Sequence, residues 1–303
     1  MLLTQTIEAG SKSGTIDESS VKRMAIDTTV MEKTIAYPTD ARLYERAHAQ
    51  LVVLAQEAGV GLRQGYARLA PRLALQAGRY AHAKRFGRMR KVLKRLKGYT
   101  GRATRDLRGH LDDLPAGALR ERVLDKLVLV SHLRHQQPKG GDKIYALHEP
   151  EVDCTSEGKA RVRYGFGYKV SIATTLDEGF IVGMRSFPGN PYDCHTLVPT
   201  LERVEILTDQ RPDLVVVDRG YRGHGALKTR VLISGTRRGL TPKLIPHLRR
   251  PSAIAAEIGH MKTDGRLSRF QLKGAVGDAL FAVLCGSGHN IRKILAYLRA
   301  LLA

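Results

Sequence analysis

The chain has 303 residues and a formal net charge of +21, with 50 Lys and Arg against 29 Asp and Glu. Its length allows one large domain with an insertion, or two domains. A charge excess of this size indicates a polyanionic partner, and we expect nucleic acid. The three cysteines are scattered and form no CxxC pair, which argues against a zinc ribbon and a disulfide framework.

The sequence gives no sign of a membrane segment. No apolar run approaches the roughly 18 residues that a membrane helix needs. The first residues lack the basic start and long apolar stretch of a signal peptide. We therefore expect a cytoplasmic protein that associates with the nucleoid and makes no membrane contact.

The first part of the chain predicts one strand followed by a helical block. Residues 1–20 are polar and predict a short helix or a disordered lead-in, and residues 24–30 predict the first strand. Asp40 is expected to cap the helix that follows. From residue 41 to about residue 133 the apolar residues recur at helical spacing, with an interruption expected at residues 98–101.

The helical block is also the most basic part of the chain. Between Arg79 and Arg108 there are twelve Lys or Arg and one acidic residue, Asp106. A solvated helix face usually carries charges of both signs, so a run of one sign indicates a surface that contacts phosphates. The residues expected to contact double-stranded DNA here are Lys84, Arg85, Arg88 and Lys91.

After a loop at residues 138–142 the pattern changes to strands. A short strand is expected at residues 143–147, and residues 164–175 and 180–186 predict a hairpin. The later elements are a helix at 194–207, strands at 214–217 and 230–234, a basic linker at 237–250, and helices at 252–262 and 275–303.

This order predicts an α/β fold in three parts. Residues 1–40 supply the lead-in and the first strand of a mixed sheet. Residues 41–138 form a large, basic, all-helical insertion after that strand. Residues 139–303 supply the rest of the sheet, its flanking helices and the C-terminal helices.

Two aspartates stand in strand contexts that suit metal chemistry. Asp218 follows the apolar run 214–217, and Asp27 lies in the first predicted strand. Open α/β sheets place their chemistry at the carboxyl ends of strands, and carboxylates are ligands that Mg²⁺ prefers. The sequence therefore predicts a site for Mg²⁺ (or Mn²⁺) at Asp27 and Asp218, suited to phosphodiester chemistry. Arg219 and Arg222 directly follow and suit DNA phosphates.

Several segments, in order along nearly the whole chain, carry a resemblance to a known family. They are residues 27–30 with 37–40, 78–84, 187–193, 217–223, 258–262 and 272–274. Together they resemble the DDE (Asp-Asp-Glu) transposases of bacterial insertion sequences, in particular the group numbered five. In that resemblance, residues 27–40 correspond to the first-aspartate segment and residues 217–223 to the second-aspartate motif.

The resemblance implies an RNase H-like fold and a magnesium-dependent site. It also implies cutting and joining of double-stranded DNA at terminal inverted repeats and at a target, by a protein that is a homodimer on DNA. By position, Asp27 and Asp218 take the first two metal-ligand roles. Lys262 takes the place of a lysine that contacts DNA.

The chain departs from the family pattern at two places. The family's glutamate lies seven residues before that lysine, where this chain has Ala255. Glu257 stands two residues later, about 200° around a helix, and is expected to face away from the aspartates unless the helix start is shifted. Relatives also have an N-terminal helical DNA-binding region, whereas 26 residues precede Asp27 here, so we expect a truncated chain.

Three functions stay open from the sequence. The first is a metal-dependent DNA transposase with a site degraded at Ala255, and the second is a non-catalytic, DNA-binding remnant of one. The third is a structural nucleic-acid-binding protein, which predicts no convergent aspartates. Whether a third carboxylate, such as that of Glu257, reaches the aspartate pair discriminates between them. Asp193 and Asp209 are expected to be helix caps rather than ligands.

Overall fold

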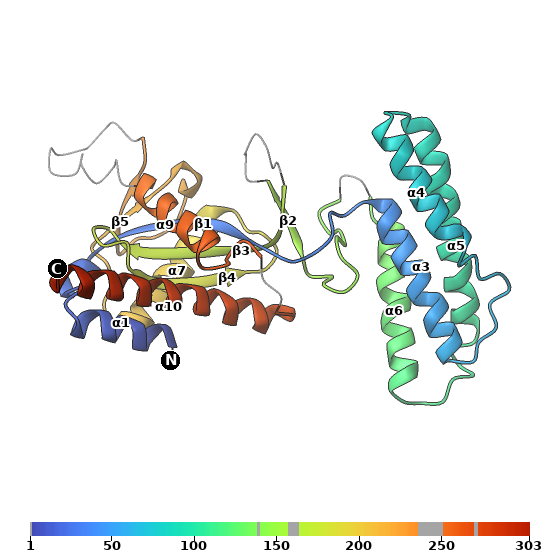
Figure 1. The fold of residues 1–303 in the computed structure, drawn as a ribbon, viewed down its shortest axis with the longest axis horizontal. Coiled ribbons are helices and arrows are strands. Elements are labelled where there is room, and N and C mark those ends of the chain that lie inside the picture. The colour runs from blue at the N-terminus through green and yellow to red at the C-terminus, as the bar shows by residue number, and fades with distance from the viewer. Residues whose placement is uncertain (1, 138–139, 157–163, 236–250, 270–271) are drawn as a thin grey trace. The chain divides into compact units, whose positions relative to one another are not determined.

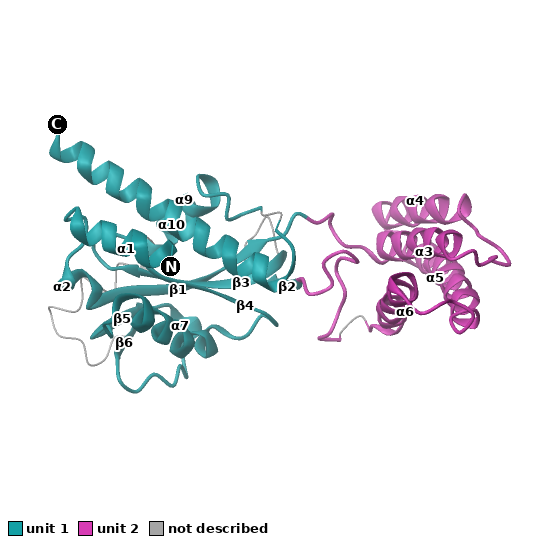
Figure 2. Cartoon of the chain, turned by 90° about the horizontal axis from the view of Figure 1, so that it is seen from below, with its two compact units in different colours: residues 1–34, 153–303 teal, residues 35–152 magenta. Residues whose placement is uncertain are grey.

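The structure is a computed structural model that describes residues 2–137, 140–156, 164–235, 251–269 and 272–303, without the side chains of 251–253. The basic linker expected at residues 237–250 lies outside the described residues. The chain divides into two compact units (Figure 2). One comprises Met1–Thr34 with Asp153–Ala303, and the other comprises Ile35–Val152.

The first unit is built on a mixed, six-stranded sheet (Figure 1). Strand β1 pairs with β3 in antiparallel and with β5 in parallel orientation, and β6 adds to β5 in parallel. Strands β2 and β4 both pair with β3 in antiparallel orientation. The strands are β1 (Arg23–Glu32), β2 (Asp153–Ser156), β3 (Tyr164–Thr175), β4 (Ile181–Phe187), β5 (Leu214–Val217) and β6 (Arg230–Ile233). The mixed α/β class expected from the sequence is confirmed.

Helices cover both faces of this sheet. Helix α7 lies on one face, and α1 and α10 lie on the other (Figure 2). A Cβ on Gly183 of β4 would lie 2.7 Å from Val204 of α7, so glycine permits that close packing. The helices of this unit are α1 (Leu2–Lys12), α2 (Glu18–Val21), α7 (Asp193–Thr208), α9 (Pro251–Thr263) and α10 (Gly274–Leu301).

The register of β1 against β5 brings the two predicted aspartates together. Arg23 pairs with Leu214, and Ala25 pairs with Val216. The same register, continued by two residues, leads to Asp27 on one strand and to Asp218 just after the other. Because alternate residues of a strand share a face, the parallel pairing directs both carboxylates to the same side.

The second unit contains four helices in its described part, α3 (Asp40–Glu57), α4 (Leu69–His82), α5 (Phe86–Gly109) and α6 (Ala118–His135) (Figure 1). Its core is separate from that of the sheet and contains the fully buried side chains of Leu51, Leu96 and Leu127. The apolar residues at helical spacing in the sequence supply this core.

The predicted interruption at residues 98–101 is wrong, because α5 runs through them without a break. A Cβ on Gly101 would lie 2.6 Å from the guanidinium of Arg134 on α6. The glycine therefore serves close packing of two helices and not a turn. A propensity argument weighs the cost of glycine inside a helix but does not include this tertiary contact.

The predicted strand at residues 143–147 is also wrong. These residues have no strand structure, and Ile144 and Leu147 are buried in the core of the helical unit. Their apolar side chains are explained by that burial. The strand found in this region is β2, which begins six residues beyond Leu147 at Asp153.

Candidate functional site

A cavity of about 450 Å³ in the first unit brings together residues from five elements of the chain. Its wall includes side chains from β1, β2, β3, the start of α7 and α9, together with Asp218 after β5. The charged residues that line it are Asp27, Lys169, Asp193, Asp218 and Lys262. The wall therefore combines three carboxylates with two amines.

Asp27 lies within β1, and its Oδ1 accepts a hydrogen bond from the backbone N–H of Thr28 at 2.8 Å. The pKa of Asp27 is raised from 3.8 to about 6, mainly by burial of the carboxyl. The hydrogen bond from Thr28 lowers this pKa, while repulsion by Asp218 and Asp193 raises it further. An opposite charge beside it would relieve this cost. The carboxyl thus stands in a place that favours a bound cation.

Asp218 directly follows β5 and caps the short 3₁₀ helix Arg219–Tyr221. Its Oδ1 accepts a hydrogen bond from the backbone N–H of Gly220 at 2.8 Å. Asp218 is exposed and lines the cavity. The two arginines predicted to bind DNA, Arg219 and Arg222, are exposed but do not line the cavity. The guanidinium of Arg219 lies against Gly235.

Asp193, expected to be a helix cap, instead lines the cavity beside the other two aspartates. The N-cap of α7 is Tyr192, and Asp193 is the first residue of the helix. Its Oδ1 accepts hydrogen bonds from Thr28 Oγ1 at 2.7 Å and from Lys169 Nζ at 2.9 Å. The expectation for Asp209 is confirmed, because it is the C-cap of α7 in the left-handed conformation, with φ of 54°.

Ala255 of α9 lines the cavity at the position that the family pattern gives to glutamate. Lys262, further along the same helix, lines the same cavity. A spacing of seven residues is close to two helical turns, which explains why both reach it. A methyl group offers no oxygen to a metal, so α9 contributes a cation but no carboxylate here.

Glu257 does not line this cavity. Its Oε1 lies 2.6 Å from Lys293 Nζ, and its Oε2 lies 3.2 Å from His289 Nε2, both on α10. Burial raises the pKa of Glu257, but the hydrogen bonds from His289 and Lys293 outweigh it and hold the pKa below the ordinary value of 4.5. The Glu257 carboxylate therefore links α9 to α10.

In the helical unit, the basic run predicted to bind DNA lies on α4, α5 and the turn between them. Lys84, Arg85, Arg88 and Lys91 are all exposed. Across the described residues, none of the twelve basic side chains between Arg79 and Arg108 forms an ion pair with a carboxylate. The positive charge of this surface is therefore not neutralised within the unit.

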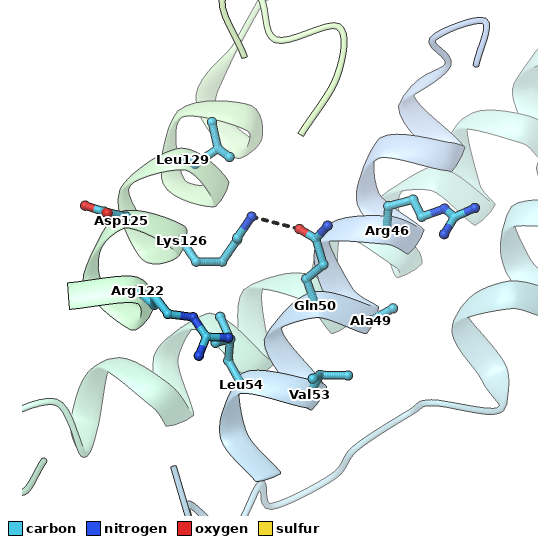
Figure 3. Close-up of a pocket in the computed structure, with 9 residues that line it drawn as sticks. All are labelled: Arg46, Ala49, Gln50, Val53, Leu54, Arg122, Asp125, Lys126 and Leu129. Atoms are coloured by element: carbon cyan, nitrogen blue, oxygen red, sulfur yellow. Dashed lines mark hydrogen bonds between the residues drawn. The ribbon is translucent and has the colours of Figure 1, made fainter. Parts of the chain in front are cut away.

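A second hollow, of about 560 Å³, lies between α3 and α6 (Figure 3). Val53, Leu54 and Leu129 form its apolar wall, and Lys126 donates a hydrogen bond to Gln50 at 2.9 Å. Arg122 at its rim is paired with Glu57 at 2.9 Å. The hollow has no convergent carboxylates, so the catalytic candidates stay in the first cavity.

Divalent cations are held in proteins by two kinds of site. One has three or more protein ligands, and the other has one or two carboxylates with water and substrate phosphate. Among the described residues, no three His, Cys, Asp or Glu side chains are grouped closely enough to hold a metal. Mg²⁺ is often bound by one or two carboxylates, with water and substrate phosphate completing its shell. The cavity contains the two carboxylates of Asp27 and Asp218, the number that this second kind of site needs, and the crowding of negative charge around Asp27 favours a cation.

Residues 131–238 match the family described as the transposase DDE domain. This match confirms the resemblance to DDE transposases over that segment. The segment includes Lys169, Asp193 and Asp218 of the cavity, while Asp27 and Ala255 lie outside it.

The chain is also 49% identical over 85 residues to a Rhizobium meliloti protein described as an uncharacterized protein, ORF8, in the nfe locus. The aligned part is 28% of this chain and 41% of that protein, so the chain spans less than half of the relative's length. No solved structure matches the chain. Within its described part, no helix is both long and apolar enough to cross a membrane.

Proposed function

We propose that the chain is a DNA transposase of an insertion sequence, by origin a metal-dependent enzyme that cuts and joins DNA, with a degraded site. The observation that carries the proposal is the convergence of Asp27, Asp218, Ala255 and Lys262 on one cavity. These positions come from three distant parts of the sequence, since only Ala255 and Lys262 share a helix, and the family pattern assigns all four to one site. The match to the transposase DDE domain supports the same reading.

In this proposal the first unit is an RNase H-like core. The support is its sheet, in which β1 pairs with β3 in antiparallel and with β5 in parallel orientation. Residues 41–138 form the basic insertion that binds DNA phosphates. The protein would act on chromosomal DNA in the cytoplasm, as a homodimer on paired terminal inverted repeats.

Asp27 and Asp218 would hold Mg²⁺ or Mn²⁺. Such a cation supplies charge stabilisation for a phosphate under attack and lowers the pKa of bound water. Lys262 lines the cavity and would bind a DNA phosphate there. Arg219 and Arg222 would contact the DNA backbone outside the cavity, since both are exposed.

Ala255 leaves this arrangement without the family's third carboxylate, and Glu257 is engaged with Lys293 and His289 instead. We therefore expect DNA binding with little Mg²⁺-dependent cleavage. The alternative is a remnant that binds DNA and no metal. A structural nucleic-acid-binding protein is disfavoured, because it gives no reason for aspartates to converge.

A titration of the full chain with Mn²⁺, followed by electron paramagnetic resonance of the free ion, tests the metal site. We expect one site that is lost in Asp27→Asn and in Asp218→Asn, while Glu257→Gln keeps it. The melting temperature of each variant in a chelator controls for folding. If the wild-type chain binds no Mn²⁺, the proposal gives way to the non-metal remnant.

A further inference from the structure

Asp193 is a third carboxylate in the cavity, and its position is fixed more firmly than that of an ordinary surface aspartate. Thr28 Oγ1 and Lys169 Nζ donate to its Oδ1 at 2.7 Å and 2.9 Å. The Lys169 side chain is 10% exposed and also donates to the Pro191 carbonyl at 2.7 Å. A charge-assisted bond from a buried lysine strongly favours one orientation of the carboxylate.

The other oxygen of Asp193 lies toward Asp218. A Cβ on Gly220 would stand 2.7 Å from Asp193 Oδ2 and 3.1 Å from Asp218 Oδ1, so both oxygens approach one point. Within the described residues, no donor is hydrogen-bonded to this Oδ2. The Asp193 side chain is 29% exposed and lines the cavity.

A second polar group in the cavity wall also lacks a hydrogen-bond donor or acceptor among the described residues. The hydroxyl of Thr155 is buried and has no hydrogen-bond partner in the described part of the chain. Buried hydroxyls are normally hydrogen-bonded, often to ordered water. The oxygen of this hydroxyl is closed off from solvent, so the position for water near Asp218 is the one at Asp193 Oδ2.

We propose that Asp193 is a positioning residue of the cation site, and that its Oδ2 accepts a hydrogen bond from a water ligand of the ion held by Asp27 and Asp218. This inference rests on the proposed function. Direct ligation by all three carboxylates is not what the described residues offer, as no three are grouped for it. Mg²⁺ keeps several waters, and groups that hold such ligands raise metal affinity. Lys169 offsets the added negative charge.

The same Mn²⁺ titration of the full chain tests this role with two further variants. Asp193→Asn removes the charge and is expected to weaken Mn²⁺ binding by about 10- to 100-fold, the range for removal of outer-shell partners. Thr28→Val keeps every charge but removes one of the two donors that hold Asp193 Oδ1, and affinity is expected to fall several-fold. Asp209→Asn, at the exposed C-terminus of the same helix, loses the same charge and should bind as the wild type does.

The outcomes separate this inference from the proposed function. Wild-type affinity in Asp193→Asn, with binding lost in Asp27→Asn and Asp218→Asn, overturns the role of Asp193 and leaves the metal site standing. Weaker binding in Asp193→Asn with no change in Thr28→Val overturns the positioning role, because charge alone would then explain the result. Absence of Mn²⁺ binding by the wild-type chain overturns both. A merely structural Asp193 would lower the melting temperature and leave the affinity of the folded chain unchanged.

Discussion

Ala255 and Glu257 lie on different sides of helix α9. Ala255 lines the cavity that contains Asp27 and Asp218, whereas Glu257 is held by Lys293 at 2.6 Å. Two residues along a helix correspond to about 200°, so the two side chains cannot serve the same site. In the proposed function, Glu257 therefore has a structural role and Ala255 marks the missing ligand.

Replacement of Glu257 should change stability and leave metal binding intact. The Glu257 side chain is 17% exposed and that of His289 is 4% exposed, so Glu257→Gln weakens partly buried charged hydrogen bonds. We expect the free energy of unfolding at pH 7 to fall by about 1–3 kcal/mol. Denaturant unfolding measures it, and Glu202→Gln, at an exposed position of α7, is the control.

The effect of Glu257 should depend on pH. Because the pKa of Glu257 is below 4.5 in the folded chain, its stabilising contribution is present above that value and is lost as the pH falls through the folded pKa. The stabilities of Glu257→Gln and of the wild type should therefore converge in acid. A difference that persists unchanged at low pH would contradict this account of the ion pair.

Ionisation of Asp27 should destabilise the metal-free chain, whereas ionisation of Glu257 should stabilise it. The pKa of Asp27 is raised from 3.8 to about 6, so the folded chain holds this proton more tightly than the unfolded chain does. Stability then falls as the pH rises from about 4 to about 6, by at most about 3 kcal/mol at 1.36 kcal/mol per pKa unit. Asp27→Asn should be more stable than the wild type at pH 7.5, and the gain should vanish below about pH 4. Denaturant unfolding in a chelator measures this, and a destabilised Asp27→Asn at pH 7.5 would refute it.

The exposed basic surface of the helical unit should control DNA affinity and its salt dependence. Charge reversal of Lys84, Arg88 and Lys91 should lower affinity for duplex DNA at least tenfold at moderate salt. The slope of log affinity against log salt should become shallower by about one for each phosphate that the variant no longer neutralises. Fluorescence anisotropy at several salt concentrations measures both quantities.

The matched control for this surface reverses three exposed lysines of the other unit, Lys12, Lys22 and Lys228. It makes the same change in net charge at a different place. An equal fall in affinity in the two triple variants would mean that overall charge, and not this surface, binds DNA.

The sequence predicted those parts of the fold whose signal is local. The β1 strand, the β3–β4 hairpin and α9 all follow from apolar patterning and turn residues close in the chain. The course of α5 through Gly101 was missed, because this glycine is explained by its close packing against Arg134 on another helix. Local patterns carry no information on such tertiary packing.

Only part of the candidate cavity could be predicted from the sequence. The convergence of Asp27 and Asp218 on one cavity was predicted, because each has a strand context and a motif. The place of Asp193 in the same cavity was not predicted, because it depends on hydrogen bonds from Thr28, 165 positions away in the sequence, and from Lys169 in a different strand. The loop before α7 carried a family motif that includes Asp193, and this was the signal that could have found it.

The most direct test of the account is restoration of the missing carboxylate. Supercoiled plasmid is incubated with Mg²⁺ and either the wild-type chain, Ala255→Glu, or Ala255→Glu combined with Asp27→Asn. We expect little nicking by the wild type, partial and non-specific nicking by Ala255→Glu, and none by the double variant, because the added carboxylate completes a site that still requires Asp27. Robust cleavage by the wild-type chain that is lost in Glu257→Ala would contradict the account, since Glu257 would then be the working third carboxylate.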